Sequence, residues 1–234
     1  MLPTDLSRRT LFSAAAAFAV MGAADPTLAR AHKHKPHAKS VAKPSSGAAH
    51  WAMGVQLWTV NAQMKTDAAG TLKALKALGY ETVETAGLYG ATAAALKTQI
   101  TDAGLVCRSY HASMGDLLAG VDTHIANAQT LGATWLVCSS PQPPAALDPA
   151  TPWVQAMYDS MTLDAWKTNA DNIAKLAPAI TSSGLKFAYH NHPMEFRDLG
   201  GGATGYGLIA QASDACAWKW ISAGWRHRAT IRSR

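Results

Sequence analysis

Residues 186–196 read KFAYHNHPMEF. The apolar start of this stretch predicts a short buried strand, and the polar residues after it predict a loop at the carboxyl end of that strand. In an α/β barrel, functional side chains gather at the carboxyl ends of the strands. His190, His192 and Glu195 are therefore candidate metal ligands, or acid and base groups, of one pocket. The alternative is a solvated loop, because His-x-His alone is a weak metal signature.

The chain before this stretch alternates short apolar runs with longer segments of helical periodicity. Strands are predicted at 53–58, 82–84, 105–111 and 134–138, and helices at 67–78, 92–103, 116–131 and 162–183. A glycine follows each helix, as is common where a helix ends in a left-handed residue: Gly79, Gly104, Gly132 and Gly184. No G-x-G-x-x-G motif follows the first strand, which disfavours a dinucleotide-binding fold. We expect an α/β (β/α) TIM barrel over residues 51–213, incomplete because it holds about five to six of the eight βα units.

Polar residues lie at or near the carboxyl ends of all five predicted strands: Gln56, Glu84, His111, Ser139 and His190. Burying a polar group without a partner is unfavourable, so their common position predicts a shared pocket. Gln56 and Ser139 could instead be buried polar groups whose hydrogen bonds are satisfied within the protein.

The charge distribution argues against nucleic acid as a partner. The chain has 234 residues and a formal charge of +6. Residues 50–214, however, contain nine Lys and Arg against 13 Asp and Glu, and the remaining basic residues lie towards the two ends of the chain. A protein that binds phosphates should carry its basic patch on the folded body. The three cysteines are widely spaced and imply no disulfide framework.

The amino terminus has the features of an export signal. Arg8 and Arg9 precede the apolar residues 11–24, and Ala29 and Ala31 offer a cleavage site. The arginine pair resembles a twin-arginine signal over residues 1–31, so we expect the twin-arginine export machinery as a partner and a periplasmic or secreted protein. We expect no stable membrane span, because the apolar run is shorter than the roughly 20 residues that a bilayer needs. Residues 32–50 are predicted to be a disordered linker rich in His, Lys and Pro, with weak metal capture as the alternative.

Four segments together resemble the sugar phosphate isomerase/epimerase family, the xylose isomerase-like TIM barrels. They are GVQLWTV at 54–60, GYETVE at 79–84, His111, and YHNHPMEF at 189–196. The resemblance implies an exported, metal-dependent enzyme that isomerises or epimerises a sugar or sugar phosphate by proton transfer next to a carbonyl. It also implies a divalent metal, which would be manganese, magnesium or zinc.

The same resemblance implies roles for individual residues. Glu195 would be a metal ligand; the catalytic residues would be His190, His111 and Glu84; and the sugar would be bound by Gln56, Asn191 and His192. Two other functions stay open: a lyase or hydrolase of keto-sugar glycosides on the same barrel, and a non-catalytic sugar-binding protein. A related barrel that repairs nucleic acid fits the acidic body poorly.

Residues 214–234 depart from the family pattern. The family barrel continues with three more strands and further acidic ligands, whereas this segment is basic and has no alternation that predicts a strand. If the reading frame starts at the third base of each codon, the codons of Trp218-Lys219 contain a Glu codon and those of Trp220-Ile221 contain an Asp codon. Both acids occur in the missing family segment. We hypothesise a frameshift near residues 214–216, with a natural short variant as the alternative. We then expect an unpaired fifth strand, an incompletely coordinated metal and impaired activity.

The export signal predicts the fate of a double substitution, Arg8→Lys with Arg9→Lys. The precursor should stay in the cytoplasm, because the paired arginines are the recognised feature. Cell fractionation followed by immunoblotting measures this, with Arg30→Lys as the control that should still be exported. Mature protein of the double variant in the periplasm would contradict the prediction.

Overall fold

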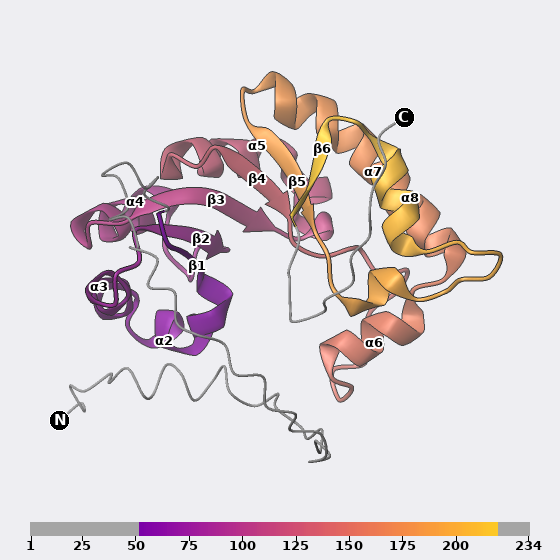
Figure 1. Ribbon diagram of the computed structural model, residues 1–234, viewed down its shortest axis with the longest axis horizontal. Coiled ribbons are helices and arrows are strands. Elements are labelled where there is room, and N and C mark those ends of the chain that lie inside the picture. Colours follow the sequence, from indigo (N-terminus) through magenta and orange to yellow (C-terminus); the bar gives the residue numbers. More distant parts are fainter. Residues whose placement is uncertain (1–51, 220–234) are drawn as a thin grey trace, which may run out of the picture. The chain divides into compact units, whose positions relative to one another are not determined.

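A computed structural model describes residues 52–219. Six strands form one parallel sheet in which each strand pairs with its neighbour in the sequence (Figure 1). The strands are β1 Gly54–Gln56, β2 Thr82–Ala86, β3 Val106–Ala112, β4 Trp135–Cys138, β5 Lys186–His190 and β6 Cys216–Lys219. Sequential parallel pairing with helical connections is the arrangement of a TIM barrel, which has eight strands. The predicted α/β incomplete barrel is confirmed.

Helices connect the strands. They are α2 Asn61–Thr66, α3 Ala68–Ala77, α4 Ala93–Asp102, α5 Met114–Leu131, α6 Trp153–Ser160, α7 Leu163–Ser182 and α8 Gly205–Ala212, with 3₁₀ turns η1 Leu57–Val60 and η2 Pro193–Phe196. The four predicted helices correspond to α3, α4, α5 and α7 and agree to within two residues at each end. The sequence analysis did not predict α2, α6 or α8, because helices of six to eight residues show too little periodicity.

Local hydrogen bonds explain where the long helices begin and end. The side chains of Thr92, Ser113 and Thr162 each accept a hydrogen bond from a backbone N–H in the first turn of α4, α5 and α7. Helix α5 ends at Gly132, whose φ of 73° is left-handed and therefore favours glycine. The other three glycines predicted to follow helices also have positive φ.

The main core lies between the sheet and the helices. Strand side chains alternate between two faces, and one set of them packs against the apolar sides of α4, α5 and α7. Buried members of this core include Leu72, Val83, Leu96, Cys107, Leu117, Leu136, Ile173 and Phe187. The other face of the strands carries Glu84, Ser109, Trp135 and Ala188, which line a cavity described below.

Strand β6 corrects two expectations from the sequence. We expected no strand after residue 213 and an unpaired β5, yet Cys216–Lys219 pairs with β5, from Phe187↔Cys216 to His190↔Lys219. The Trp218 ring packs against Tyr189 of β5 at 5.5 Å and against Tyr206 of α8 at 4.1 Å between centroids. These long-range aromatic contacts favour the extended conformation and leave no trace in the local pattern.

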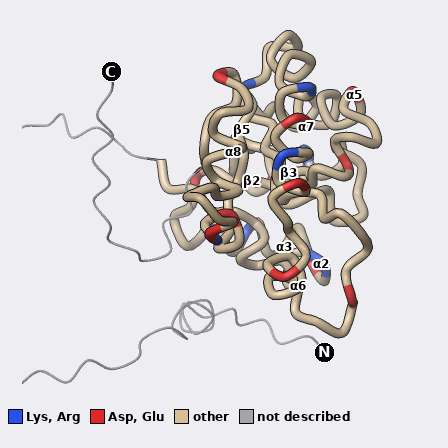
Figure 2. The backbone as a smooth tube through the Cα atoms, turned by 90° about the vertical axis from the view of Figure 1, so that its right-hand side faces the viewer, with Lys and Arg blue, Asp and Glu red and all other residues tan. Residues whose placement is uncertain are grey.

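Acidic and basic positions are interspersed over the described body (Figure 2). Residues 52–219 contain ten Lys and Arg against 13 Asp and Glu, so this part of the chain is net negative. Among the same residues, no helix combines the length and the apolar character needed to cross a bilayer. The predicted signal, the linker and residues 220–234 of the basic tail lie outside the described residues.

The packed core predicts the effect of truncating Phe187. Phe187→Ala removes a side chain that is only 1% exposed, and it should lower the free energy of unfolding by about 3–5 kcal/mol. Leu118→Ala is the matched control, because Leu118 is 45% exposed and its loss should change stability by less than about 0.5 kcal/mol. Urea unfolding followed by circular dichroism measures both. Equal losses in the two variants would contradict the packing described here.

Candidate functional site

A row of polar side chains crosses the carboxyl ends of the strands. Glu84 Oε2 lies 3.5 Å from His111 Nε2. The ring of His111 is 5.3 Å from that of His190, and the ring of His190 is 5.0 Å from that of His192, both edge to face. We call Glu84, His111, His190 and His192 the histidine cluster. Of the five strand-end residues predicted to share a pocket, the structure brings Glu84, His111 and His190 together, and His192 from the loop after β5 lies beside them.

The parallel register explains why these residues meet. Ala86, His111, Val137 and Ala188 are successive partners across β2 to β5. Glu84 lies two residues before Ala86, and His190 lies two residues after Ala188. Because side chains alternate along a strand, residues two apart point to the same face of the sheet. Glu84, His111 and His190 therefore project on the same side.

Burial keeps the two central imidazoles neutral. Desolvation, with a smaller contribution from His192, lowers the pKa of His111 to about 4 although Glu84 is close. Desolvation, followed by His111 and His192, lowers the pKa of His190 to about 3. At neutral pH each ring thus has one N–H donor and one acceptor nitrogen.

Two buried polar atoms next to each other in the sequence have no hydrogen-bond partner among the described residues. They are Nδ1 of His190 and Oδ1 of Asn191. An unsatisfied buried polar atom is unfavourable by about 1–3 kcal/mol. Such atoms at a strand end, beside other polar groups, are typical of a site that a polar ligand completes.

Glu195 is part of the support beneath this site. Its carboxylate is fully buried. Oε1 accepts a hydrogen bond from the Tyr189 hydroxyl at 2.9 Å, and Oε2 accepts one from the backbone N–H of His192 at 2.7 Å. Tyr189 precedes His190 in β5, so its side chain points to the opposite face from His190. Glu195 therefore ties the loop that carries His192 to the helix-covered side of the sheet.

The described residues do not make a complete metal site. Within residues 52–219, no group of three or more His, Cys, Asp or Glu side chains is arranged to hold a metal ion. Both oxygens of Glu195, the ligand that the family resemblance implies, already accept hydrogen bonds within the protein. The described residues therefore do not supply a complete donor set for the implied divalent metal.

Gln56 and Ser139 lie at strand ends but have local partners. Oε1 of Gln56 accepts a hydrogen bond from the Trp58 N–H at 3.1 Å and caps η1. The backbone N–H of Ser139 donates to the carbonyl of Ala112 at 2.8 Å, which continues the pairing of β3 and β4. These contacts agree with the alternative that Gln56 is a satisfied polar group, and its predicted sugar contact stays a prediction.

The structure adds Trp153 to the neighbourhood of the site. The Trp153 ring, at the start of α6, lies 5.0 Å from the His192 ring in an edge-to-face contact. The sequence analysis missed this residue, because a single Trp in a Pro-rich segment has no pattern and its contact with His192 spans 39 residues of sequence.

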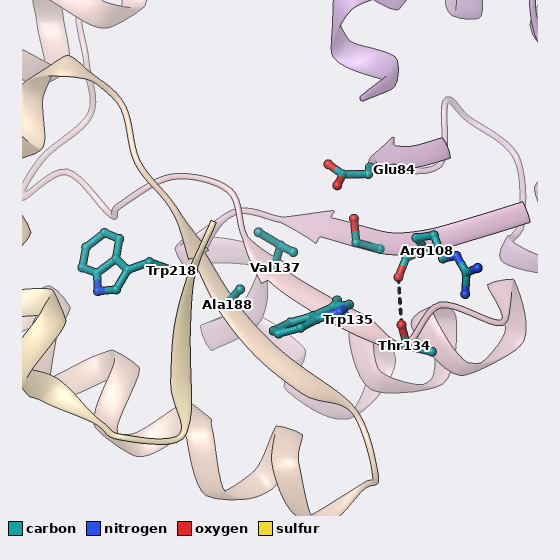
Figure 3. A pocket seen from close by; sticks show the side chains of 8 residues that line it. Glu84, Arg108, Thr134, Trp135, Val137, Ala188 and Trp218 are labelled. Atoms are coloured by element: carbon teal, nitrogen blue, oxygen red, sulfur yellow. Dashed lines mark hydrogen bonds between the residues drawn. The ribbon is translucent and has the colours of Figure 1, made fainter. Parts of the chain in front are cut away.

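A cavity of about 380 Å³ lies against the face of the sheet that carries Glu84 (Figure 3). Its lining residues are Glu84, Arg108, Ser109, Thr134, Trp135, Val137, Ala188 and Trp218. Arg108, Thr134 and Trp135 lie towards the amino ends of β3 and β4, so the cavity extends from Glu84 along the strands and away from the histidine cluster. Glu84 is the residue that the cavity and the cluster share.

Solved structures with a similar fold were found for this chain, although its sequence has no close match. No family model matches the chain, and no curated protein is similar to it in sequence. Two solved structures of sugar phosphate isomerase/epimerase proteins from Parabacteroides distasonis ATCC 8503 are similar. One has a TM-score of 0.56 at 18% identity and covers 74% of this chain and 66% of its own. The other has a TM-score of 0.55 at 20% identity, with coverages of 71% and 67%.

The fold is that of these isomerase/epimerase structures. This agrees with the resemblance of the sequence motifs, and the chain spans about two thirds of the length of each structure. A xylose isomerase-like TIM barrel protein from Mycobacterium smegmatis in complex with magnesium is less similar, with a TM-score of 0.47 at 16% identity and coverages of 72% and 63%.

The lowered pKa values predict how stability depends on pH. Between the ordinary value of 6.5 and about 4, the unfolded chain binds protons at His111 and His190 that the folded chain does not. Their contribution to stability is therefore fully present above pH 6.5 and is lost as the pH falls through this window. We expect the urea midpoint to fall over the same range. The fall should be smaller in His190→Asn and unchanged in the control His124→Asn. A ring of His111 or His190 that titrates near 6.5 by NMR would contradict this.

Proposed function

We propose that this chain is a sugar isomerase or epimerase that moves a proton at a carbon next to a carbonyl. The observation that carries the proposal is the histidine cluster, in which a carboxylate and two neutral imidazoles meet at the carboxyl ends of parallel strands. The unpartnered atoms of His190 and Asn191 support a polar ligand that is rich in hydroxyl groups. The fold of the two similar isomerase/epimerase structures agrees with this reaction class.

The chemistry assigns different tasks to the three catalytic residues. Glu84 is partly exposed and is the base that takes the proton from the carbon. His190, which is neutral, donates an N–H to the carbonyl oxygen and so stabilises the charge that develops there; a weakly basic neutral imidazole suits this task better than proton abstraction. His111 holds the Glu84 carboxylate at 3.5 Å, and the protonated Glu84 then returns the proton to the neighbouring carbon.

The remaining predicted residues orient the sugar in this proposal. Asn191 and His192 follow directly after β5, and their side chains provide hydrogen bonds to sugar hydroxyls. Gln56 would join them after release of its bond to the Trp58 N–H. Glu195 acts through the loop that it holds and does not touch the sugar.

The divalent metal implied by the family resemblance has no part in these steps. Residues 52–219 do not supply a complete set of ligands, so the proposal assigns chemistry only to side chains that the structure describes.

We also propose that the protein is exported to the periplasm by the twin-arginine machinery. The support is the sequence of residues 1–31, with Arg8 and Arg9 before an apolar run and Ala29 and Ala31 at a cleavage site.

Solvent exchange tests the proposed reaction. Incubation of the purified chain with a panel of ketoses and aldoses in D₂O should replace the proton next to the carbonyl by deuterium, which NMR detects with or without net conversion. Added manganese is one arm of the assay. His190→Ala and Glu84→Gln should each lower the exchange rate by about 10²–10⁴-fold.

His124→Ala is the matched control. His124 lies on α5, where it contacts Tyr110 at 3.0 Å outside the histidine cluster, so its loss should leave exchange unchanged. No exchange of any sugar by the wild-type chain, or full exchange by His190→Ala, would refute the proposal. A protein that only binds sugar would keep its affinity in His190→Ala and show no exchange in any variant.

A further inference from the structure

A second cavity, of about 410 Å³, lies beside α6 and shares no lining residue with the cavity described above. It is lined by Leu147, Asp148, Pro149, Ala150, Thr151, Pro152, Trp153 and Ala156. Trp153 is 42% exposed there. A large aromatic ring that borders a hollow offers an apolar surface to a ligand.

This cavity is connected to the histidine cluster through ring contacts. Trp153 lines the cavity and also contacts His192 at 5.0 Å, and His192 contacts His190 at 5.0 Å. The His192 ring, which contacts both Trp153 and His190, therefore connects the cavity to the cluster.

The walls of the cavity are held in place before any ligand binds. Asp148 accepts hydrogen bonds from the Ala150 N–H at 2.9 Å and from the Thr151 hydroxyl at 3.0 Å, which sets the shape of the loop before α6. Helix α6 is fixed to the body by Met157, which is 1% exposed, and by Arg197, which stacks over Tyr158 and donates to the carbonyl of Met161. A preformed wall lowers the entropy cost of binding.

The chemistry of the lining matches a sugar ring. The indole of Trp153 suits the apolar C–H face of a pyranose. Each oxygen of the Asp148 carboxylate can accept a further hydrogen bond besides the one it already has, and sugar hydroxyls are donors for it. The lining contains no Lys or Arg, so it is not suited to a phosphate group.

We propose that the cavity beside Trp153 is a subsite for a second sugar ring, and that the substrate is accordingly a disaccharide or another glycoside. The identity of the histidine cluster as the place of the reacting ring rests on the function proposed above. The subsite itself rests on the separate geometry of Trp153, Asp148 and α6. A free monosaccharide would fill the cluster and leave this cavity to water.

Matched pairs of sugars test the subsite. Isothermal titration of the full chain would compare glucose with cellobiose, galactose with lactose, and xylose with xylobiose. At least one disaccharide should bind about tenfold more tightly than its monosaccharide, a difference that corresponds to about 1.4 kcal/mol. Trp153→Ala should abolish this advantage and leave the affinity for the monosaccharide unchanged, whereas Trp153→Phe should retain most of it.

Val154→Ala is the control, because Val154 is 45% exposed on the same helix but does not line the cavity. It should behave like the wild-type chain. Circular dichroism of each variant separates loss of the subsite from loss of the fold. Equal affinity for both members of every pair, an equal weakening of both in Trp153→Ala, or no binding of any sugar would overturn the subsite.

The outcomes separate this proposal from the proposed reaction. A disaccharide preference that depends on Trp153, without solvent exchange of any sugar, would leave the subsite standing and refute the isomerase. Exchange of monosaccharides without any disaccharide preference would support the isomerase and refute the subsite.

Discussion

The parallel hydrogen-bond ladder from β1 to β6 is the constraint on which the rest of the structure depends. It aligns all strand ends at one rim, and it fixes which side chains face the helices and which face the cavity. Leu136 and Phe187 are buried as a result of this alternation, and Glu84 and His190 are brought to the site by the same alternation. A shift of one residue in the pairing of β5 would exchange His190 with Tyr189 and dismantle both the core and the cluster.

The site combines a loop that is held in place by buried hydrogen bonds with side chains that have unsatisfied hydrogen-bonding atoms. Glu195 satisfies Tyr189 and the backbone of His192, so the loop after β5 is held by buried hydrogen bonds. The side chains above it, His190 and Asn191, keep buried atoms without partners. This division is physically consistent, because a ligand can use the free hydrogen-bonding capacity only if the surrounding loop does not move to satisfy it first. The metal at Glu195 that the family resemblance implies stays a prediction; in the structure both oxygens of this carboxylate accept hydrogen bonds within the protein.

Two short elements outside the regular βα repeat, α6 and β6, add contacts to the site and to the edge of the sheet. Helix α6 and the loop before it place Trp153 beside His192, and the short β6 covers the outer edge of β5. The sequence analysis missed both, for two different reasons. Helix α6 is too short to show a period, and β6 is stabilised by contacts of Trp218 with Tyr189 and Tyr206. Aromatic contacts over such distances in the sequence have no local signature.

The sequence by itself determined the βα repeat, the four long helices with their terminal glycines, and the set of strand-end residues Glu84, His111 and His190. Each of these depends on hydrophobic periodicity or on backbone conformation, which neighbouring residues encode. Only the tertiary structure decided that the two histidines are neutral, that Glu195 faces Tyr189, and that Trp153 extends the site. These properties depend on burial and on distances between remote segments, and those exist only once the strands have paired.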